Sequence, residues 1–170
     1  EKTRVLYENE EKIVFFLEPS PSGKQLAMLW ADRKVGVSVA LLDLAKGTVV
    51  ESKAVKTDDH FLKPRLNWTP KGDALIFTTR GEASKWPANV VRCDAASGEL
   101  KVLVKEGGWA VGGVLQDGMV SVFNREEKKA GLMDPGTGTI LDSQAKVVVI
   151  QTVKGRALLF DFEKRSFFVD

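Results

Sequence analysis

The sequence predicts an all-β protein built from a repeated four-stranded antiparallel unit. Three observations lead to this prediction. The apolar runs, such as "IVFF", "QLAMLWA" and "KVVVIQTV", are short and rich in β-branched and aromatic residues, and Gly, Pro, Asp or Ser bounds them. No segment has the length and period of a long helix. Two kinds of turn recur in the same order along the chain.

The first turn ends in a glycine that precedes a short apolar strand. A hairpin turn with Gly at a positive φ has this pattern. Four copies align, in "PSPSGKQLAML", "WTPKGDALIF", "VLQDGMVSVF" and "QTVKGRALLF", and their glycines are Gly23, Gly72, Gly118 and Gly155.

The second turn has the form Asp-x-x-x-Gly and lies between two apolar runs. Its copies begin at Asp43, Asp94 and Asp134, which follow the first three turn glycines by 20, 22 and 16 residues. Asp opens such a turn by accepting bonds from backbone amides ahead of it, and Gly closes it in the left-handed region. We therefore expect each unit to be a meander with one turn of each kind.

The units recur every 37 to 49 residues, which is the spacing of β-propeller blades. We predict a single domain over residues 1–170 with four blades, at about 13–55, 60–107, 108–144 and 145–170. The fourth unit reaches only "RSFFVD", and "EKTRVLYE" at the start of the chain resembles "GELKVLVKE" after Asp94. Residues 1–8 are therefore expected to supply the last strand of the fourth blade, which would hide exposed sheet edges. The alternatives are a closed four-bladed ring and an arc completed by another chain, such as an eight-bladed homodimer.

The elements "PSPSGKQLAML" and "WTPKGDALIF" resemble the "WSPDGKxLAF" element of WD-repeat-like β-propellers. That group includes the Tol-system periplasmic propeller and the propeller domains of prolyl-oligopeptidase-type peptidases. The resemblance covers most of the chain and concerns the fold alone. It implies no catalytic residue.

Composition excludes several classes of function. The net charge is +2 with interspersed charges, so no basic block suggests a nucleic-acid partner. No apolar run is long enough to span a bilayer. The lone Cys93 excludes an intrachain disulfide and lies in an apolar run, so we expect a buried, inert thiol. The start at Glu1 is expected of a processed chain or of part of a longer protein, and a periplasmic or exported location is slightly favoured over the cytoplasm.

The sequence offers few catalytic or ligand-binding groups. His60 in "TDDHF" is the one histidine. Its neighbours do not provide the ligand set of a zinc site, and no Gly-x-Ser-x-Gly element provides the nucleophile of a Ser-His-Asp triad. "KEGGWAVGG" lacks the Gly-Lys-Ser/Thr of a phosphate loop and is expected to be a strand near the ring centre. "DPGTGT" is expected to be a turn, since it lacks the acidic ligands of a calcium loop. We therefore expect no catalytic residues, no cofactor and no metal.

The aromatic residues suggest a binding surface instead. Trp30, Trp68 and Trp109 are expected to wedge between sheets. Trp86 lies in the loop "RGEASKWPANV", where it either anchors a protein partner or folds back onto its own blade. The charged tip "NREEKK" and the loop "ADRKVG" hold the equivalent place in their units, between second and third strands. The predicted partner site comprises Trp86, Lys85, Arg33, Lys34, Arg125 and Lys128.

Three functions remain open from the sequence. The chain could be a non-enzymatic propeller that binds a protein or peptide through loops on one face, which we favour. It could be the propeller part of a larger enzyme or envelope assembly. It could also hold a small molecule or glycan in a central channel near Gly108–Gly113.

Overall fold

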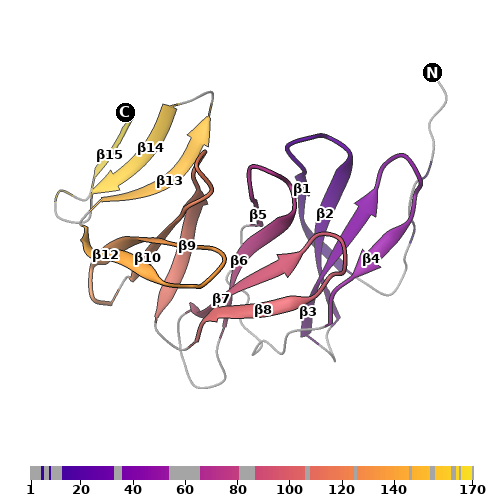
Figure 1. The fold of residues 1–170 in the computed structure, drawn as a ribbon, viewed down its shortest axis with the longest axis horizontal. Helices are drawn as coiled ribbons and strands as arrows, with labels where there is room; N and C mark the ends of the chain where they lie inside the picture. The colour runs from indigo at the N-terminus through magenta and orange to yellow at the C-terminus, as the bar shows by residue number, and fades with distance from the viewer. Residues whose placement is uncertain are drawn as a thin grey trace.

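A computed structural model describes residues 5, 8, 13–32, 36–53, 66–80, 87–105, 108–124, 126–145, 147–153, 156–161, 164 and 166–169. Within these residues the regular elements are all β-strands, and they form four antiparallel sheets (Figure 1). The predicted all-β class is confirmed. No helix among the described residues is long and apolar enough to cross a membrane.

Each sheet is a meander in which consecutive strands pair. Sheet 1 contains β1 (Ile13–Pro19), β2 (Gln25–Asp32), β3 (Gly36–Asp43) and β4 (Val49–Glu51). Sheet 2 contains β5 (Asn67–Trp68), β6 (Ala74–Arg80), β7 (Pro87–Asp94) and β8 (Leu100–Val104). Sheet 3 contains β9 (Trp109–Val114), β10 (Val120–Asn124), β11 (Lys129–Met133) and β12 (Ile140–Ala145). In the described residues sheet 4 has three strands, β13 (Val147–Val153), β14 (Arg156–Asp161) and β15 (Ser166–Val169).

Both predicted turns are present where the residues are described. In the first turn, the amides of Gly23 and Gly72 donate to the carbonyls of Ser20 and Thr69 over 2.9 Å. In the second turn, the amide of each closing glycine donates to the carbonyl of the opening Asp, as from Gly98 to Asp94 over 2.9 Å. The glycines have positive φ, which a Cβ would make costly. Gly155 lies outside the described residues.

The sheets pack face to face because their central strands are apolar on both sides. Leu75, Ile76 and Phe77 of β6 are fully buried, although successive side chains point to opposite faces. Leu75 and Phe77 belong to a cluster shared with sheet 1, whereas Ile76 belongs to a cluster shared with sheet 3. Each such side chain contributes roughly 1.5–3 kcal/mol through burial. Because a central strand buries apolar side chains on both of its faces, the sheets stack one after another in a row.

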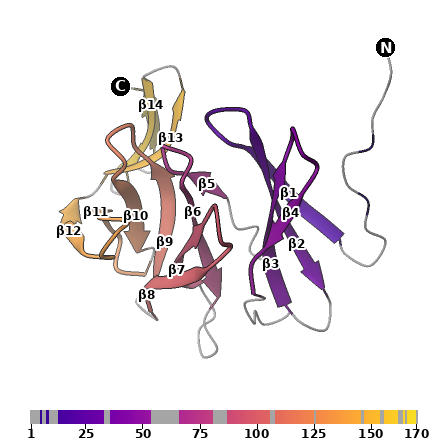
Figure 2. The same cartoon turned by 45° about the vertical axis from the view of Figure 1, so that its right-hand side comes forward.

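The row of sheets forms an arc, with sheet 1 and sheet 4 at its opposite ends (Figures 1 and 2). Sheet 4 contacts sheet 3 through β13, which lies against β9, β10 and β11. The predicted pairing of residues 1–8 with β15 lies outside the described residues, apart from Val5 and Glu8, which are not in strands. Whether the ring closes therefore stays a prediction.

Hydrogen bonds also join neighbouring sheets. The indole N–H of Trp68 donates to the carbonyl of Glu18 in sheet 1 over 3.0 Å. The amide of Val111 in sheet 3 donates to Thr78 Oγ1 in sheet 2 over 2.9 Å. These bonds satisfy polar groups that packing between sheets removes from water, and they fix the relative height of the sheets.

The three tryptophans expected between sheets have two different roles. Trp68 packs in the cluster between sheets 1 and 2, and Trp109 packs in the one between sheets 2 and 3, as predicted. Trp30 is fully buried but lies on the face of sheet 1 that points away from sheet 2. Its indole N–H donates to Ser38 Oγ over 2.5 Å and to Glu51 Oε1 over 3.0 Å, which holds the ring on its own sheet.

Candidate functional site

The candidate site is the rim of the arc formed by the loops between second and third strands, here called the loop rim. The strand residues that flank these loops pair directly: Asp32 with Gly36, Arg80 with Pro87, and Asn124 with Lys129. All three loops leave the C-terminal end of a second strand. The same topology places all three loops at one end of their sheets.

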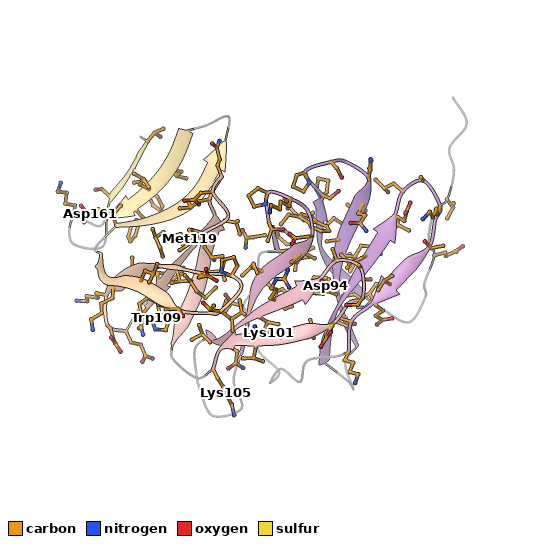
Figure 3. All side chains as sticks on the ribbon, in the orientation of Figure 1. Asp94, Lys101, Lys105, Trp109, Met119 and Asp161 are labelled. Carbon is orange, nitrogen blue, oxygen red and sulfur yellow. The ribbon has the colours of Figure 1, made fainter. Side chains whose placement is uncertain are left out.

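The turns between first and second strands mark the opposite rim, here called the turn rim. A Cβ on Gly72 would lie 3.6 Å from Cδ of Pro21, so these turns of sheets 1 and 2 are neighbours. In sheet 3, Met119 follows the Gly118 turn, whereas Trp109 pairs with Asn124 at the loop rim; Figure 3 shows the two at different ends of the sheet. The two rims are therefore distinct surfaces.

The best described part of the loop rim is the tip at residues 126–128. The buried side chain of Asn124 accepts bonds from the amides of Glu126 and Glu127 over 3.1 and 3.0 Å. Lys128 has a φ of 53°, the one positive φ of a non-glycine residue in the described part of the chain. Glu126, Glu127 and Lys128 are exposed. Asn124 thus holds a charged tip in a defined conformation.

A salt bridge orders the base of this tip. Lys129 Nζ lies 2.9 Å from Glu127 Oε2, and both side chains are partly exposed. Because solvent screens such a pair, it contributes little to stability. It leaves Glu126 and Lys128 as neighbouring exposed charges of opposite sign that a partner could contact.

The structure describes one of the six residues predicted for the partner site. Lys128 is exposed at the tip, as the prediction requires. Trp86, Lys85, Arg33, Lys34 and Arg125 lie outside the described residues. Whether the six side chains form one surface therefore stays a prediction, although the strands that carry the three loops are in place.

The turn rim carries three identical carboxylate turns. Asp94 Oδ1 accepts the amides of Ala96 and Ser97 over 3.0 and 2.9 Å, and Asp43 and Asp134 accept the equivalent amides of their own turns. These bonds, led by the one from Ser97, lower the pKa of Asp94 below its ordinary value of 3.8. The pKa values of Asp43 and Asp134 are lowered by the same cause. The carboxylates act as turn supports.

The described residues show little catalytic chemistry. Cys93 is buried, as predicted, and desolvation raises its pKa to about 12, which disfavours the reactive thiolate. No cluster of three or more His, Cys, Asp or Glu suited to a metal ion occurs in the described residues. His60 lies outside them. Residues 109–113 of the glycine-rich segment lie in β9, the first strand of sheet 3, and a strand follows β9 where a phosphate loop would need a helix.

Sequence reasoning missed a set of exposed apolar side chains at the outer part of sheets 3 and 4. Leu132 and Leu141 are paired across β11 and β12, and Phe167 and Val169 lie on β15. The repeat does carry a signal for this exposure. Its last unit reaches only a third strand, so side chains next to the place of a fourth strand are expected to be uncovered. Which side chains those neighbours expose depends on the register of the sheets, which the repeat alone does not give.

Comparison with known proteins gives a fold and no family. No family model matches the chain, and no curated protein does either. Among solved structures, a prolyl endopeptidase is similar with a TM-score of 0.61 and 12% identity, over 96% of this chain and 27% of that one. A putative TolB from Agrobacterium tumefaciens has a TM-score of 0.55 and 14% identity, over 96% and 63%. A eukaryotic initiation factor has a TM-score of 0.53 and 17% identity, over 96% and 45%.

The chain thus spans less than two thirds of the length of these solved proteins. At this level of identity the likeness concerns the fold alone. The similarity to TolB and peptidase propellers, together with the four antiparallel meanders, shows a β-propeller type of fold, here an arc of four sheets.

Proposed function

We propose that this protein is a non-enzymatic scaffold that binds a protein or peptide partner through its loop rim. The observation that carries the proposal is the rigid support of that rim. Three loops leave paired strand ends, and the tip at residues 126–128 presents exposed charges held by the buried Asn124. A preorganised loop surface loses less conformational entropy on binding than a mobile one.

The chemistry of the rim fits a protein partner. In the proposed site Trp86 would be the apolar anchor, and the cations around it would be Arg33, Lys34, Lys85, Arg125 and Lys128. Aromatic side chains dominate binding energy at interface centres, whereas rim charges set orientation and association rate. Because the tip also presents the exposed Glu126, the partner surface would carry complementary charges of both signs around an apolar pocket. The proposal includes an exported compartment, and the similarity to a putative TolB supports this part of it.

The test uses the whole chain as bait in the source extract and compares binding between the two rims. Lys128→Glu and Trp86→Ala should each reduce capture of the same partner, Trp86→Ala by about thirty-fold or more in affinity, since an anchoring Trp contributes ~2–4 kcal/mol. Lys71→Glu is the matched control, because Lys71 is an exposed lysine in the Gly72 turn of the opposite rim. His60→Ala is a second control. All variants are first checked for unchanged melting.

Two results would count against the proposal. If Lys71→Glu abolishes capture and Lys128→Glu does not, the partner binds the turn rim. If Trp86→Ala unfolds the protein while binding per folded molecule is retained, Trp86 is a core residue and the assigned site is wrong.

A second candidate is supported by the comparisons. The chain matches 27% of a prolyl endopeptidase and 45% of an initiation factor, so this fold occurs as part of longer proteins. In that case the arc is the propeller part of an enzyme or assembly, and the activity resides outside residues 1–170. The intact mass of the protein purified from its source distinguishes this candidate from the first.

A further inference from the structure

One position of the repeat is buried in three sheets and exposed in the fourth. Leu42, Cys93 and Met133 each precede the Asp of a second turn, and each is at most 3% exposed. Each is flanked by an apolar residue of the second strand and an aliphatic residue of the fourth: Leu26 and Val49, Leu75 and Leu100, Val120 and Ile140. Val169 holds this position in sheet 4, opposite Leu158, yet it is 54% exposed.

The exposure of Val169 follows from an absent neighbour. Among the described residues, β15 pairs with β14 alone, so its outer edge carries no strand. Phe167, two residues before Val169, is 64% exposed, whereas Val91 at the same position in sheet 2 is buried. An open edge with apolar side chains is a site for strand addition.

Sheet 3 is uncovered at the matching place. Leu132 and Leu141 form a cross-strand pair on the face opposite to the Met133 cluster, which is the side where sheet 4 lies. Both are exposed, although Leu41, at the position of Leu132 in sheet 1, is buried against sheet 2. Among the described side chains, Leu132 and Leu141 are thus less covered at the junction of sheets 3 and 4 than Leu41 is at the junction of sheets 1 and 2.

Sheet 1, at the other end of the arc, carries a turn of the kind that contacts a preceding fourth strand in sheets 2 and 3. The turns closed by Gly98 and Gly138 rest on the fourth strand of the preceding sheet, with Glu51 and Leu103 as their backbone neighbours. The Asp43–Gly47 turn has the same hydrogen bond and positive φ. Within the described residues no sheet precedes sheet 1. Val14 and Leu17 of β1 are exposed on the face of sheet 1 that points away from sheet 2.

The N-terminal segment has the sequence of a fourth strand. Val5 in "TRVLYE" aligns with Val102 in "LKVLVK" of β8, and β1 follows this segment at nearly the spacing with which β9 follows β8. Val102 pairs with Val91, so Val5 would pair with Phe167 in sheet 4. Val5 is 73% exposed in the single chain.

We propose that a second copy of this chain supplies the fourth strand of sheet 4 and that its sheet 1 then packs beside that sheet. In every junction within the chain, a fourth strand leads into the first strand of the next sheet: β4 into β5, β8 into β9, β12 into β13. A strand donated by residues 1–8 therefore delivers the donor's sheet 1 to sheet 4 of the acceptor. The donor's Asp43–Gly47 turn then contacts the added strand, as the Gly98 and Gly138 turns contact the fourth strands that precede them.

The donor is a second copy because of the shape of the arc. Sheet 1, which residues 1–8 precede, lies at the opposite end of the row from β15 (Figures 1 and 2). The interface joins two different surfaces, head to tail, and such an interface makes a closed ring if the rotation between copies closes. Two arcs of four sheets give an eight-sheet ring.

The test exploits the head-to-tail geometry. Chains of residues 1–170 should sediment at twice the monomer mass of 18.7 kDa or more. Val5→Asp removes the donor strand and Phe167→Asp removes the acceptor edge, so each variant alone should be monomeric. An equimolar mixture should form a one-to-one dimer, since one intact interface remains. Val102→Asp is the matched control, because Val102 is an exposed valine of a fourth strand inside the arc, and it should leave assembly unchanged.

Each other outcome overturns the proposal. A wild-type chain that stays monomeric at all concentrations has no such interface. If the wild type is monomeric and Val5→Asp lowers its melting temperature, residues 1–8 pair within their own chain. If both blocked variants still assemble, or if their mixture does not, the contact is not the head-to-tail exchange of this strand. Circular dichroism verifies that each variant is folded.

Discussion

Gly138 of sheet 3 lies directly on the backbone of Leu103 in sheet 2: a Cβ at Gly138 would come within 2.9 Å of the Leu103 carbonyl carbon. Two independent constraints therefore require glycine at this position: its φ of 81° and the close contact with the backbone of the neighbouring sheet. This close approach lets the turn between the third and fourth strands of one sheet cover the fourth strand of the sheet before it.

Replacing Gly138 by Ala should destabilise the protein by more than positive φ alone explains. Strained backbone conformations cost roughly 1–3 kcal/mol, and the clash with Leu103 adds to this. Gly23→Ala is the matched control, because Gly23 has a φ of 68° and a Cβ added there would meet nothing within 4 Å. Urea unfolding should show a larger loss for Gly138→Ala. Equal losses would mean that the sheets separate at little cost.

Thr78 and Thr79 are adjacent threonines with opposite expected responses to valine. Thr78 Oγ1 accepts the amide of Val111 across the sheet junction, so Thr78→Val should cost about 1–3 kcal/mol by leaving that amide unpaired. Thr79 Oγ1 is buried and has no hydrogen-bond partner in the described structure. Thr79→Val should therefore be neutral or stabilising. Thermal melting of both variants checks the pair, and a reversed order would contradict the assigned junction.

Lys128 holds a left-handed conformation that costs a non-glycine residue roughly 1–2 kcal/mol. Lys128→Gly should relieve this strain and raise stability, less the entropy that glycine adds to the unfolded chain. Lys128→Ala removes the same charge and keeps the strain, so it should be no more stable than the wild type. Denaturant midpoints distinguish the two effects. If both variants behave alike, charge and not conformation governs this tip.

Acid should weaken the protein through the three carboxylate turns. The pKa of Asp94 is lowered by amide bonds in the folded state, so its stabilisation is complete above the ordinary value of 3.8 and is lost as the pH falls through the folded pKa. Asp94→Asn retains an oxygen acceptor and removes the titration. Melting temperatures measured from about pH 5 down to pH 2 should therefore fall less steeply in the variant than in the wild type. An identical slope in both proteins would exclude Asp94 as a source of the acid sensitivity.

The sequence determined the local structure and the order of the sheets. Positive-φ glycines at Gly23, Gly72 and Gly118, and Asp turns at Asp43, Asp94 and Asp134, are set by backbone sterics and by amides within a few residues. Continuous apolar runs on the second strands then require a sheet on each side, because successive side chains point to opposite faces. These constraints are local or periodic, so a single sequence carries them, and the fold class followed from them.

The tertiary structure decided which side chains pack between neighbouring sheets and which remain exposed. It placed Trp68 against Glu18 and Trp109 in the next junction, but it held Trp30 on the outward face of sheet 1 through Ser38 and Glu51. It also showed that Val169 and Leu132 are exposed, whereas Leu42 and Leu41 at the same positions of sheet 1 are buried. The burial of these side chains depends on whether a neighbouring strand or sheet covers them. No local pattern records that, since the residue before the turn Asp is buried in three sheets and Val169 is exposed in the fourth.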